Sequence, residues 1–98
     1  MPYVSITKSD RAGKKLKALF TRHDGSKKTI HFGSDGMQDY TITKDKDQRK
    51  RYLDRHRKRE NWNKPETAGA LSRWILWGNS TSRRENIKAF KKRFGYKN

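Results

Sequence analysis

The chain of 98 residues contains no cysteine. This excludes a disulfide framework, a thiolate zinc site and a cysteine nucleophile, and leads us to expect an intracellular protein. Apolar residues are also scarce, at 30% of the chain, and no apolar run approaches the roughly 18–20 residues that a membrane-spanning helix needs. Residues 1–5 lack the basic start and apolar stretch of a signal peptide.

Carboxylates are few: 10 acidic residues stand against 26 Lys and Arg, so the formal net charge is +16. High net charge with low hydrophobicity is typical of disorder. However, prolines number only two, and three Trp, four Tyr and four Phe recur at regular spacings. These observations favour a single folded domain over residues 1–98 with frayed termini. A polyanion is the expected partner, nucleic acid first, then anionic membrane or acidic protein.

Residues 3–43 have the alternation of β-strands. Residues 3–7, 15–20 and 29–32 each alternate, and Asp24-Gly25 is a hairpin signal. A two-residue loop would mix the two faces of the hairpin. A three-residue loop over 23–25, with Gly25 left-handed, pairs Leu16 with Phe32 and Ala18 with Ile30 and keeps one apolar face. We therefore predict this hairpin, a turn over 33–36 and a short fourth strand over 39–43.

Residues 45–95 have the spacing of three helices. Each begins at a capping pair, with a side-chain oxygen followed three residues later by Glu or Gln: Asp45 with Gln48, Asn63 with Glu66, and Ser82 with Glu85. Apolar stripes follow: Tyr52, Leu53, His56 and Glu60 share a face; then Ala68, Leu71, Trp74 and Ile75; then Ile87, Phe90 and Phe94, with a stop at Gly95. The prediction is an α+β fold, a small antiparallel sheet of three or four strands followed by three helices. The apolar face of the sheet should pack on the second helix.

Several segments together resemble a family of short basic proteins encoded by large nucleocytoplasmic DNA viruses, including marseillevirus, chlorella-virus and mimivirus relatives. The segments are HFG at 31–33, DYT at 39–41, DQR at 47–49, RHRKRENW at 55–62, AGALSRWILW at 68–77 and KRFG at 92–95. The resemblance covers about residues 4–95. It implies a virus-encoded protein packaged in the virion, and located in the viral factory or host nucleus of an infected cell. It implies no catalytic residue.

Basic residues concentrate after residue 45, and eight of the fourteen residues in 46–59 are Lys or Arg. On helices, they would form outward-facing rows that follow phosphates, with a steep dependence of affinity on salt. The candidate nucleic-acid-binding residues are Lys50, Arg51, Arg55, Arg57, Lys58, Arg59, Arg84, Lys88, Lys91 and Lys92. The simpler alternative is a solvated helix face with ion pairs from Asp47 to Arg51 and from Asp54 to Lys58. A nuclear-localisation segment is a further interpretation.

Other chemistry has little support in the sequence. The histidines lack metal-ligand spacing, no glycine-rich loop could hold phosphate, and no nucleophile stands beside a base, so we expect no metal, no cofactor and no enzyme. The tryptophans could stack bases. We favour a core position for Trp74, hold Trp77 as less certain, and leave Trp62 open between an apolar anchor and a surface contact.

Three functions therefore compete. The first is DNA binding without sequence preference, aiding genome condensation. The second is a virion adaptor that binds acidic capsid or core protein through the apolar helix 67–77, with Trp62, Arg73, Leu76 and Trp77 as the interface and a homodimer as one form. The third is an RNA-associated module. Competition between duplex DNA and structured RNA separates the first from the third.

Overall fold

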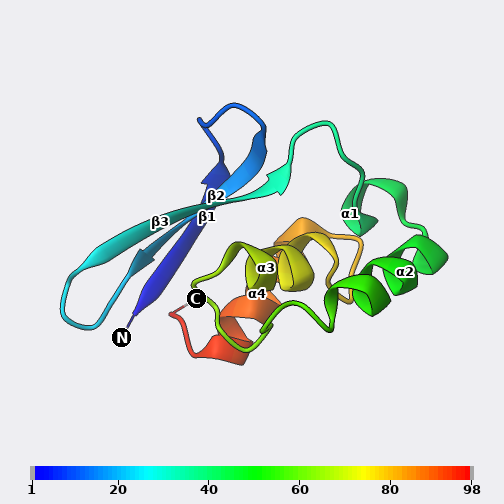
Figure 1. The fold of residues 1–98 in the computed structure, drawn as a ribbon. Helices are drawn as coiled ribbons and strands as arrows, with labels where there is room; N and C mark the ends of the chain where they lie inside the picture. Colours follow the sequence, from blue (N-terminus) through cyan, green and yellow to red (C-terminus); the bar gives the residue numbers. More distant parts are fainter. Residues whose placement is uncertain (1, 98) are drawn as a thin grey trace.

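Three antiparallel strands form the N-terminal part of the computed structural model, which describes residues 2–97 (Figure 1). β1 (Tyr3–Lys8), β2 (Lys14–Thr21) and β3 (Lys27–Ser34) form one sheet in that order. Their residues alternate between a face that packs on the helices and a face that meets solvent. The sheet is therefore a meander with its apolar side toward the helical half.

The hairpin between β2 and β3 has the predicted register. Leu16 lies opposite Phe32, and Ala18 lies opposite Ile30. Gly25 has a φ of +86°, which glycine adopts without strain, and closes the three-residue loop. The prediction is confirmed because only this register keeps the large apolar residues on one face.

Residues 33–43 differ from the prediction. Gly33 belongs to β3 rather than to the turn; its φ is +77°, and a Cβ there would come within 2.7 Å of Leu76 Cδ1, so glycine allows close packing. The predicted strand over 39–43 is wrong, since Tyr40–Thr43 form the short helix α1. The Asp39 side chain accepts the backbone N–H of Thr41 and so caps that helix.

The helix α2 (Lys46–His56) begins at the predicted cap, where the Asp45 side chain accepts the backbone N–H of Gln48. Gln48 does not bond back to the cap, because its Oε1 accepts the hydroxyl of Thr43 at 2.8 Å. The helix ends at His56, so Glu60 lies beyond it. Glu60 still meets the expected face, with Oε1 at 2.7 Å from His56 Nδ1.

The second long helical segment starts later than predicted. Thr67, not Asn63, caps α3 (Ala68–Leu71), and its Oγ1 accepts the backbone N–H of Ala70 at 3.1 Å. Glu66 cannot complete a cap at Asn63 because its carboxylate binds Arg22 at 2.6 and 3.2 Å. α3 continues into η1 (Ser72–Leu76), a π-helical turn in which the backbone N–H of residue 77 bonds to the carbonyl of residue 72.

The last helix, α4 (Arg83–Phe94), has both predicted ends. Ser82 Oγ accepts the backbone N–H of Glu85 at 3.3 Å, and Gly95 ends the helix with a φ of +76°. The buried side chain of Asn86 donates to the carbonyl of Ile75 at 2.9 Å. This bond ties α4 to η1.

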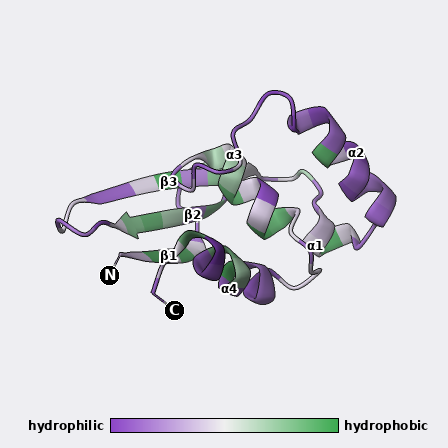
Figure 2. Ribbon diagram, turned by 90° about the horizontal axis from the view of Figure 1, so that it is seen from below, coloured by the Kyte–Doolittle hydropathy of each residue, from purple (hydrophilic) through white to green (hydrophobic). Residues whose placement is uncertain are grey.

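The core lies between the sheet and the segments α3, η1 and α4, and the hydrophobic residues of these elements are green in Figure 2. Five large side chains from these elements are at most 1% exposed, namely Phe20, Phe32, Leu71, Ile75 and Phe90. Burying such side chains contributes about 1.5–3 kcal/mol each. The α+β fold, and the packing of the sheet on the segment around residues 68–76, are confirmed.

Candidate nucleic-acid interface

The outer face of α2 and the turn after it carry most of the predicted phosphate-binding residues. The exposed ones are Lys50, Arg51, Arg55, Arg57, Lys58 and Arg59. Lys50 Nζ pairs with Asp54 Oδ2 at 3.0 Å, one turn away. Neither predicted pair on this helix, from residue 47 to 51 or from 54 to 58, forms within residues 2–97. An exposed pair of this kind contributes under about 0.5 kcal/mol, so the face keeps its positive character.

A second basic row lies on α4. Its members are four residues apart and exposed, and they are Arg84, Lys88 and Lys92; Lys91 beside them is half-buried. Arg83 turns inward and binds Asp39 at 3.3 Å. Figure 2 shows α2 and α4 apart, with α3 and the turn that follows it between them. The two predicted rows are therefore separate along most of their length.

Arginine side chains from α2, from the residue after it and from the C-terminal turn of α4 lie near Arg73 of η1. The guanidinium carbons of Arg73 and Arg93 lie 4.2 and 3.8 Å from the ring centroid of Trp74. The charges of Arg49 and Arg57 from α2 also act on Arg73. We call Arg49, Arg57, Arg73 and Arg93 the arginine cluster. One of its members, Arg57 at the end of α2, is among the predicted nucleic-acid-binding residues.

Two tryptophans support the cluster. Trp74 Nε1 donates to the carbonyl of Trp62 at 2.9 Å, which fixes the loop after α2 against η1. Arg73 lies over both rings, 5.1 Å from the Trp62 centroid. A guanidinium stacked on an aromatic face keeps its N–H donors at its edge, where an anion can accept them.

No carboxylate within residues 2–97 forms an ion pair with the arginine cluster. Arg73 Nη1 donates to the carbonyl of Trp77 at 3.1 Å, whereas its buried Nε finds no partner among these residues. Burial, followed by the charges of Arg49, Arg93 and Arg57, lowers the pKa of Arg73 to about 10. Such a group of cations is unfavourable by itself and attracts an anion.

Sequence reasoning left three members of the cluster out of the nucleic-acid-binding set: Arg49 and Arg93 were not singled out, and Arg73 was placed in the protein interface. Arg49 Nε donates to the carbonyls of Trp77 and Gly78, at 3.2 and 2.9 Å, beyond the end of η1. Arg93 contacts a ring on a different helical segment. Neither contact has a local sequence signal. Arg73 did have one, as the single charged residue between 67 and 77.

The four residues predicted for a protein interface do not share one surface. Leu76 and Trp77 are 2% and 8% exposed, and the Trp77 ring stacks on Tyr52 at 4.2 Å inside the fold. Trp62 and Arg73 are half-buried at the arginine cluster. Placing Leu76 and Trp77 on the surface was therefore wrong, because residues 67–77 close the core. Trp74, predicted in the core, is half-buried beneath arginines.

A cleft of about 680 Å³ opens between the end of β3, α2 and α3, with Phe32, Tyr52 and Trp77 among its lining residues. The Tyr52 ring lies between Trp77 at 4.2 Å and His56 at 4.1 Å, so neither face is free to stack a base. Burial raises the pKa of Tyr52, which keeps its hydroxyl neutral. The part of the chain that the structure describes has no His, Asp and Glu group fit for a metal ion. Within residues 2–97, no helix is long and apolar enough to cross a membrane.

Comparison with known proteins assigns the chain to a family. Residues 4–56, from β1 to the end of α2, match a family of unknown function (DUF5754). The chain belongs to this family. The uncharacterized protein L851 of Acanthamoeba polyphaga mimivirus is 45% identical over 40 residues, which are 41% of this chain and 40% of the relative. The match thus spans less than half of the relative's length. These findings support the resemblance to giant-virus proteins. No solved structure matches the chain significantly.

Proposed function

We propose that the protein binds duplex DNA through the phosphate backbone, without sequence preference. The observation that supports this most is the arginine cluster, which has no carboxylate partner within residues 2–97 and whose members come from α2, the residue after it, η1 and α4. Exposed lysines and arginines extend from it along both helices. Phosphate groups are the partners that such a surface neutralises, with release of counterions.

The side chains on the two helices favour phosphate contact over reading of bases. Asn and Gln side chains commonly read adenine in the major groove. Gln48 of α2 is engaged by the Thr43 hydroxyl, and Asn86 of α4 is buried and bonded to backbone. The outward positions are left mainly to Lys and Arg, which bind the phosphates of any sequence. Both can also donate to guanine, so two unrelated duplexes are compared.

We further propose that this binding serves genome condensation by a protein packaged in the virion, present in the viral factory or host nucleus of an infected cell. The mimivirus relative provides the viral context. A net charge of +16 on 98 residues would offset the mutual repulsion of packed DNA segments.

Two other functions are compared with the same observations. Structured RNA presents the same phosphate chemistry, and a competition experiment decides between RNA and DNA. The hypothesis of a virion adaptor required an exposed apolar helix, but Leu71, Ile75 and Leu76 are at most 2% exposed. The surface that would favour the adaptor is thus mostly inside the fold.

The proposal is tested by fluorescence anisotropy with two unrelated duplexes and a structured RNA between about 50 and 300 mM salt. We expect similar affinity for both duplexes, preference for duplex over RNA, and a logarithmic salt slope of several units. A flat salt response contradicts phosphate binding, and a marked preference for RNA replaces DNA as the partner.

A charge-matched pair of double variants locates the interface. Arg57→Gln with Lys58→Gln removes two charges at the end of α2, and Lys27→Gln with Lys28→Gln removes two exposed charges from β3. We expect the first pair to weaken binding about tenfold and to lower the salt slope by about two, and the second to do much less. Equal losses would mean that only total charge matters.

A further inference from the structure

We propose that Arg73 and Arg93, held against the Trp74 ring, form a discrete site for one phosphate group of the DNA backbone, with Arg57 at its rim. The assignment of that phosphate to DNA rests on the proposed function, whereas the anion site itself does not. The site differs from the exposed rows on α2 and α4 because Arg73 is half-buried and because the guanidiniums of Arg73 and Arg93 lie over the Trp74 ring.

The two guanidiniums are fixed against one aromatic ring. Their carbons lie 4.2 and 3.8 Å from the Trp74 centroid, and the Trp74 indole is itself held by its bond to the Trp62 carbonyl. A phosphate at the edge of the ring would be within reach of donors from both arginines. Paired, planar donors of this kind bind phosphate oxygens more strongly than a flexible ammonium group does.

The orientation of Arg73 is set before any ligand arrives. Its Nη1 donates to the carbonyl of Trp77, which also accepts Arg49 Nε, so both side chains are anchored at the end of η1. Arg73 is carried by the π-helical turn itself, a backbone form that occurs frequently at functional sites. Preorganised donors lose less conformational entropy on binding than mobile surface lysines.

One N–H donor of Arg73 has no hydrogen-bond acceptor within the described residues. The buried Nε finds no acceptor in residues 2–97, although buried polar atoms nearly always have one. The surrounding charges of Arg49, Arg57 and Arg93 have no carboxylate to offset them within the same residues. A phosphate would offset that charge and supply acceptors beside it.

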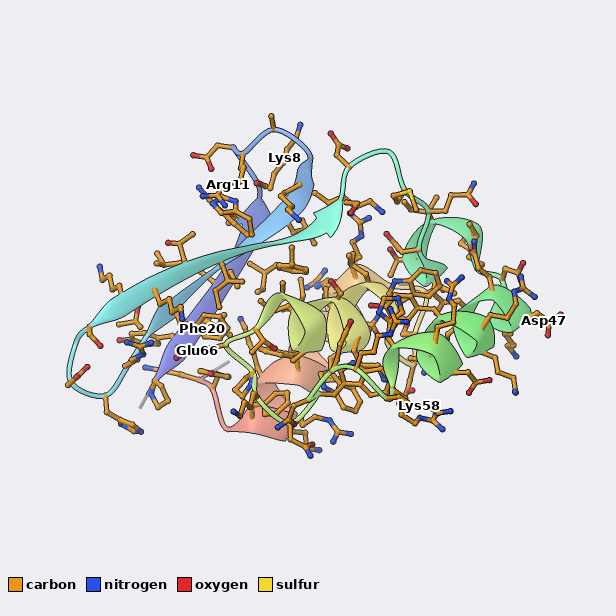
Figure 3. The ribbon with its side chains drawn as sticks, in the orientation of Figure 1. Lys8, Arg11, Phe20, Asp47, Lys58 and Glu66 are labelled. Atoms are coloured by element: carbon orange, nitrogen blue, oxygen red, sulfur yellow. The ribbon has the colours of Figure 1, made fainter. Side chains whose placement is uncertain are left out.

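The test uses thermal unfolding and tryptophan fluorescence at pH 7, with sodium phosphate compared with sodium chloride at equal ionic strength. Four proteins are compared: the wild type, Arg93→Gln, Arg73→Lys and the control Arg11→Gln. Arg93 is exposed, so its loss should not unfold the chain, and Arg73→Lys keeps the charge but removes the planar fork. Figure 3 shows Arg11 between β1 and β2, far from Lys58 and the end of α2.

We expect phosphate to raise the unfolding midpoint of the wild type and of Arg11→Gln and to change their tryptophan fluorescence, both saturably. Arg93→Gln and Arg73→Lys should each weaken the apparent affinity for phosphate at least about tenfold. An equal response in all four proteins would show a general salt effect and overturn the site.

A duplex DNA titration of the same proteins separates this proposal from the proposed function. We expect Arg93→Gln to lower the salt slope by about one relative to Arg11→Gln. Salt-dependent DNA binding that is equal in both variants overturns the phosphate site and leaves the function standing. Site-specific binding of inorganic phosphate without any DNA binding overturns DNA as the ligand.

Discussion

Two groups of charged side chains differ in whether a carboxylate neutralises their positive charge. Around Asp39, which is 1% exposed, Lys15 Nζ lies at 2.6 Å and Arg83 Nη2 at 3.3 Å from the carboxylate, and Thr41 donates its backbone N–H. This network joins β2, α1 and α4. The arginine cluster is a comparable junction between α2, η1 and α4, yet no carboxylate of residues 2–97 enters it. One junction is internally neutralised, whereas the other has no carboxylate partner among the described residues.

The pKa directions express the same difference. Burial alone would raise the pKa of Asp39, but hydrogen bonds from Lys15 and Thr41 and the charges of Lys15 and Arg83 outweigh it and hold that pKa below its usual value. Burial lowers the pKa of Arg73, and the neighbouring arginines lower it further. Stability therefore accounts for the first group of charges, and the proposed phosphate site would account for the second.

The largest expected effect comes from breaking the neutralised junction. Asp39→Asn leaves Lys15 and Arg83 without their shared partner and should cost about 3 kcal/mol of the free energy of unfolding. Urea denaturation measures this loss. DNA affinity of the folded variant should not fall, and a loss of stability below about 1 kcal/mol would contradict a structural role for the network.

Replacing Arg73, at the centre of the arginine cluster, should raise the free energy of unfolding, whereas Asp39→Asn lowers it. The folded pKa of Arg73 is about 10, below its value in the unfolded chain, so its charged form destabilises the fold below pH 10, and this cost fades as pH rises above 10. Arg73→Met keeps packing against Trp74. After allowance for solvent screening, we expect it to add about 1 kcal/mol of stability while weakening DNA binding.

The control for Arg73→Met is Arg11→Met, an exposed position that should change stability by less than about 0.5 kcal/mol. Urea denaturation and anisotropy are measured on both variants. A marked loss of stability in Arg73→Met, with DNA binding unchanged, would identify Arg73 as structural. The arginine cluster would then have the same structural role as the Asp39 network.

Acid should weaken the Asp39 network by a smaller amount. Because the folded pKa of Asp39 is depressed, its contribution is complete above the unfolded pKa and is lost as pH falls through the folded value. We expect the unfolding free energy of the wild type to fall more steeply than that of Asp39→Asn below about pH 4. Parallel curves would assign acid sensitivity to other carboxylates.

The smallest expected effect is at the exposed pair on α2. Asp54→Asn removes the partner of Lys50 at 3.0 Å and should cost at most about 0.5 kcal/mol. It also adds one net positive charge to the proposed DNA surface, so affinity at low salt should rise slightly. Thermal unfolding and anisotropy check both signs, and a loss above 1 kcal/mol would mean that exposed pairs hold α2 in place.

Sequence signals predicted the structure correctly where it depends on residues that are close together in the chain. Alternation and Gly25 predicted the hairpin register, and Ser82 and Gly95 marked the ends of α4. The five-residue alternation over 39–43 was too short to separate strand from helix. There the outcome depended on the Asp39 cap, fixed by partners 24 and 44 residues away.

The same reason explains the missed cap and the missed site. The sequence predicted Asn63 as the cap, but Thr67 caps α3, and Glu66 forms a long-range pair with Arg22. The arginine cluster draws its members from positions 49, 57, 73 and 93, on three helical segments. No periodicity within one element reveals such a meeting, although a lone charge in the apolar segment 67–77 was a signal.

The most direct test of DNA binding at the arginine cluster is a map of NMR signal changes as a short duplex is added. We predict that the indole N–H signals of Trp62 and Trp74, and backbone signals over 55–59 and 88–93, change first and most. The signals of Lys27 and Lys28 on β3, equally basic and exposed, should change little. Changes centred on β3, or spread evenly over all basic residues, would contradict the account.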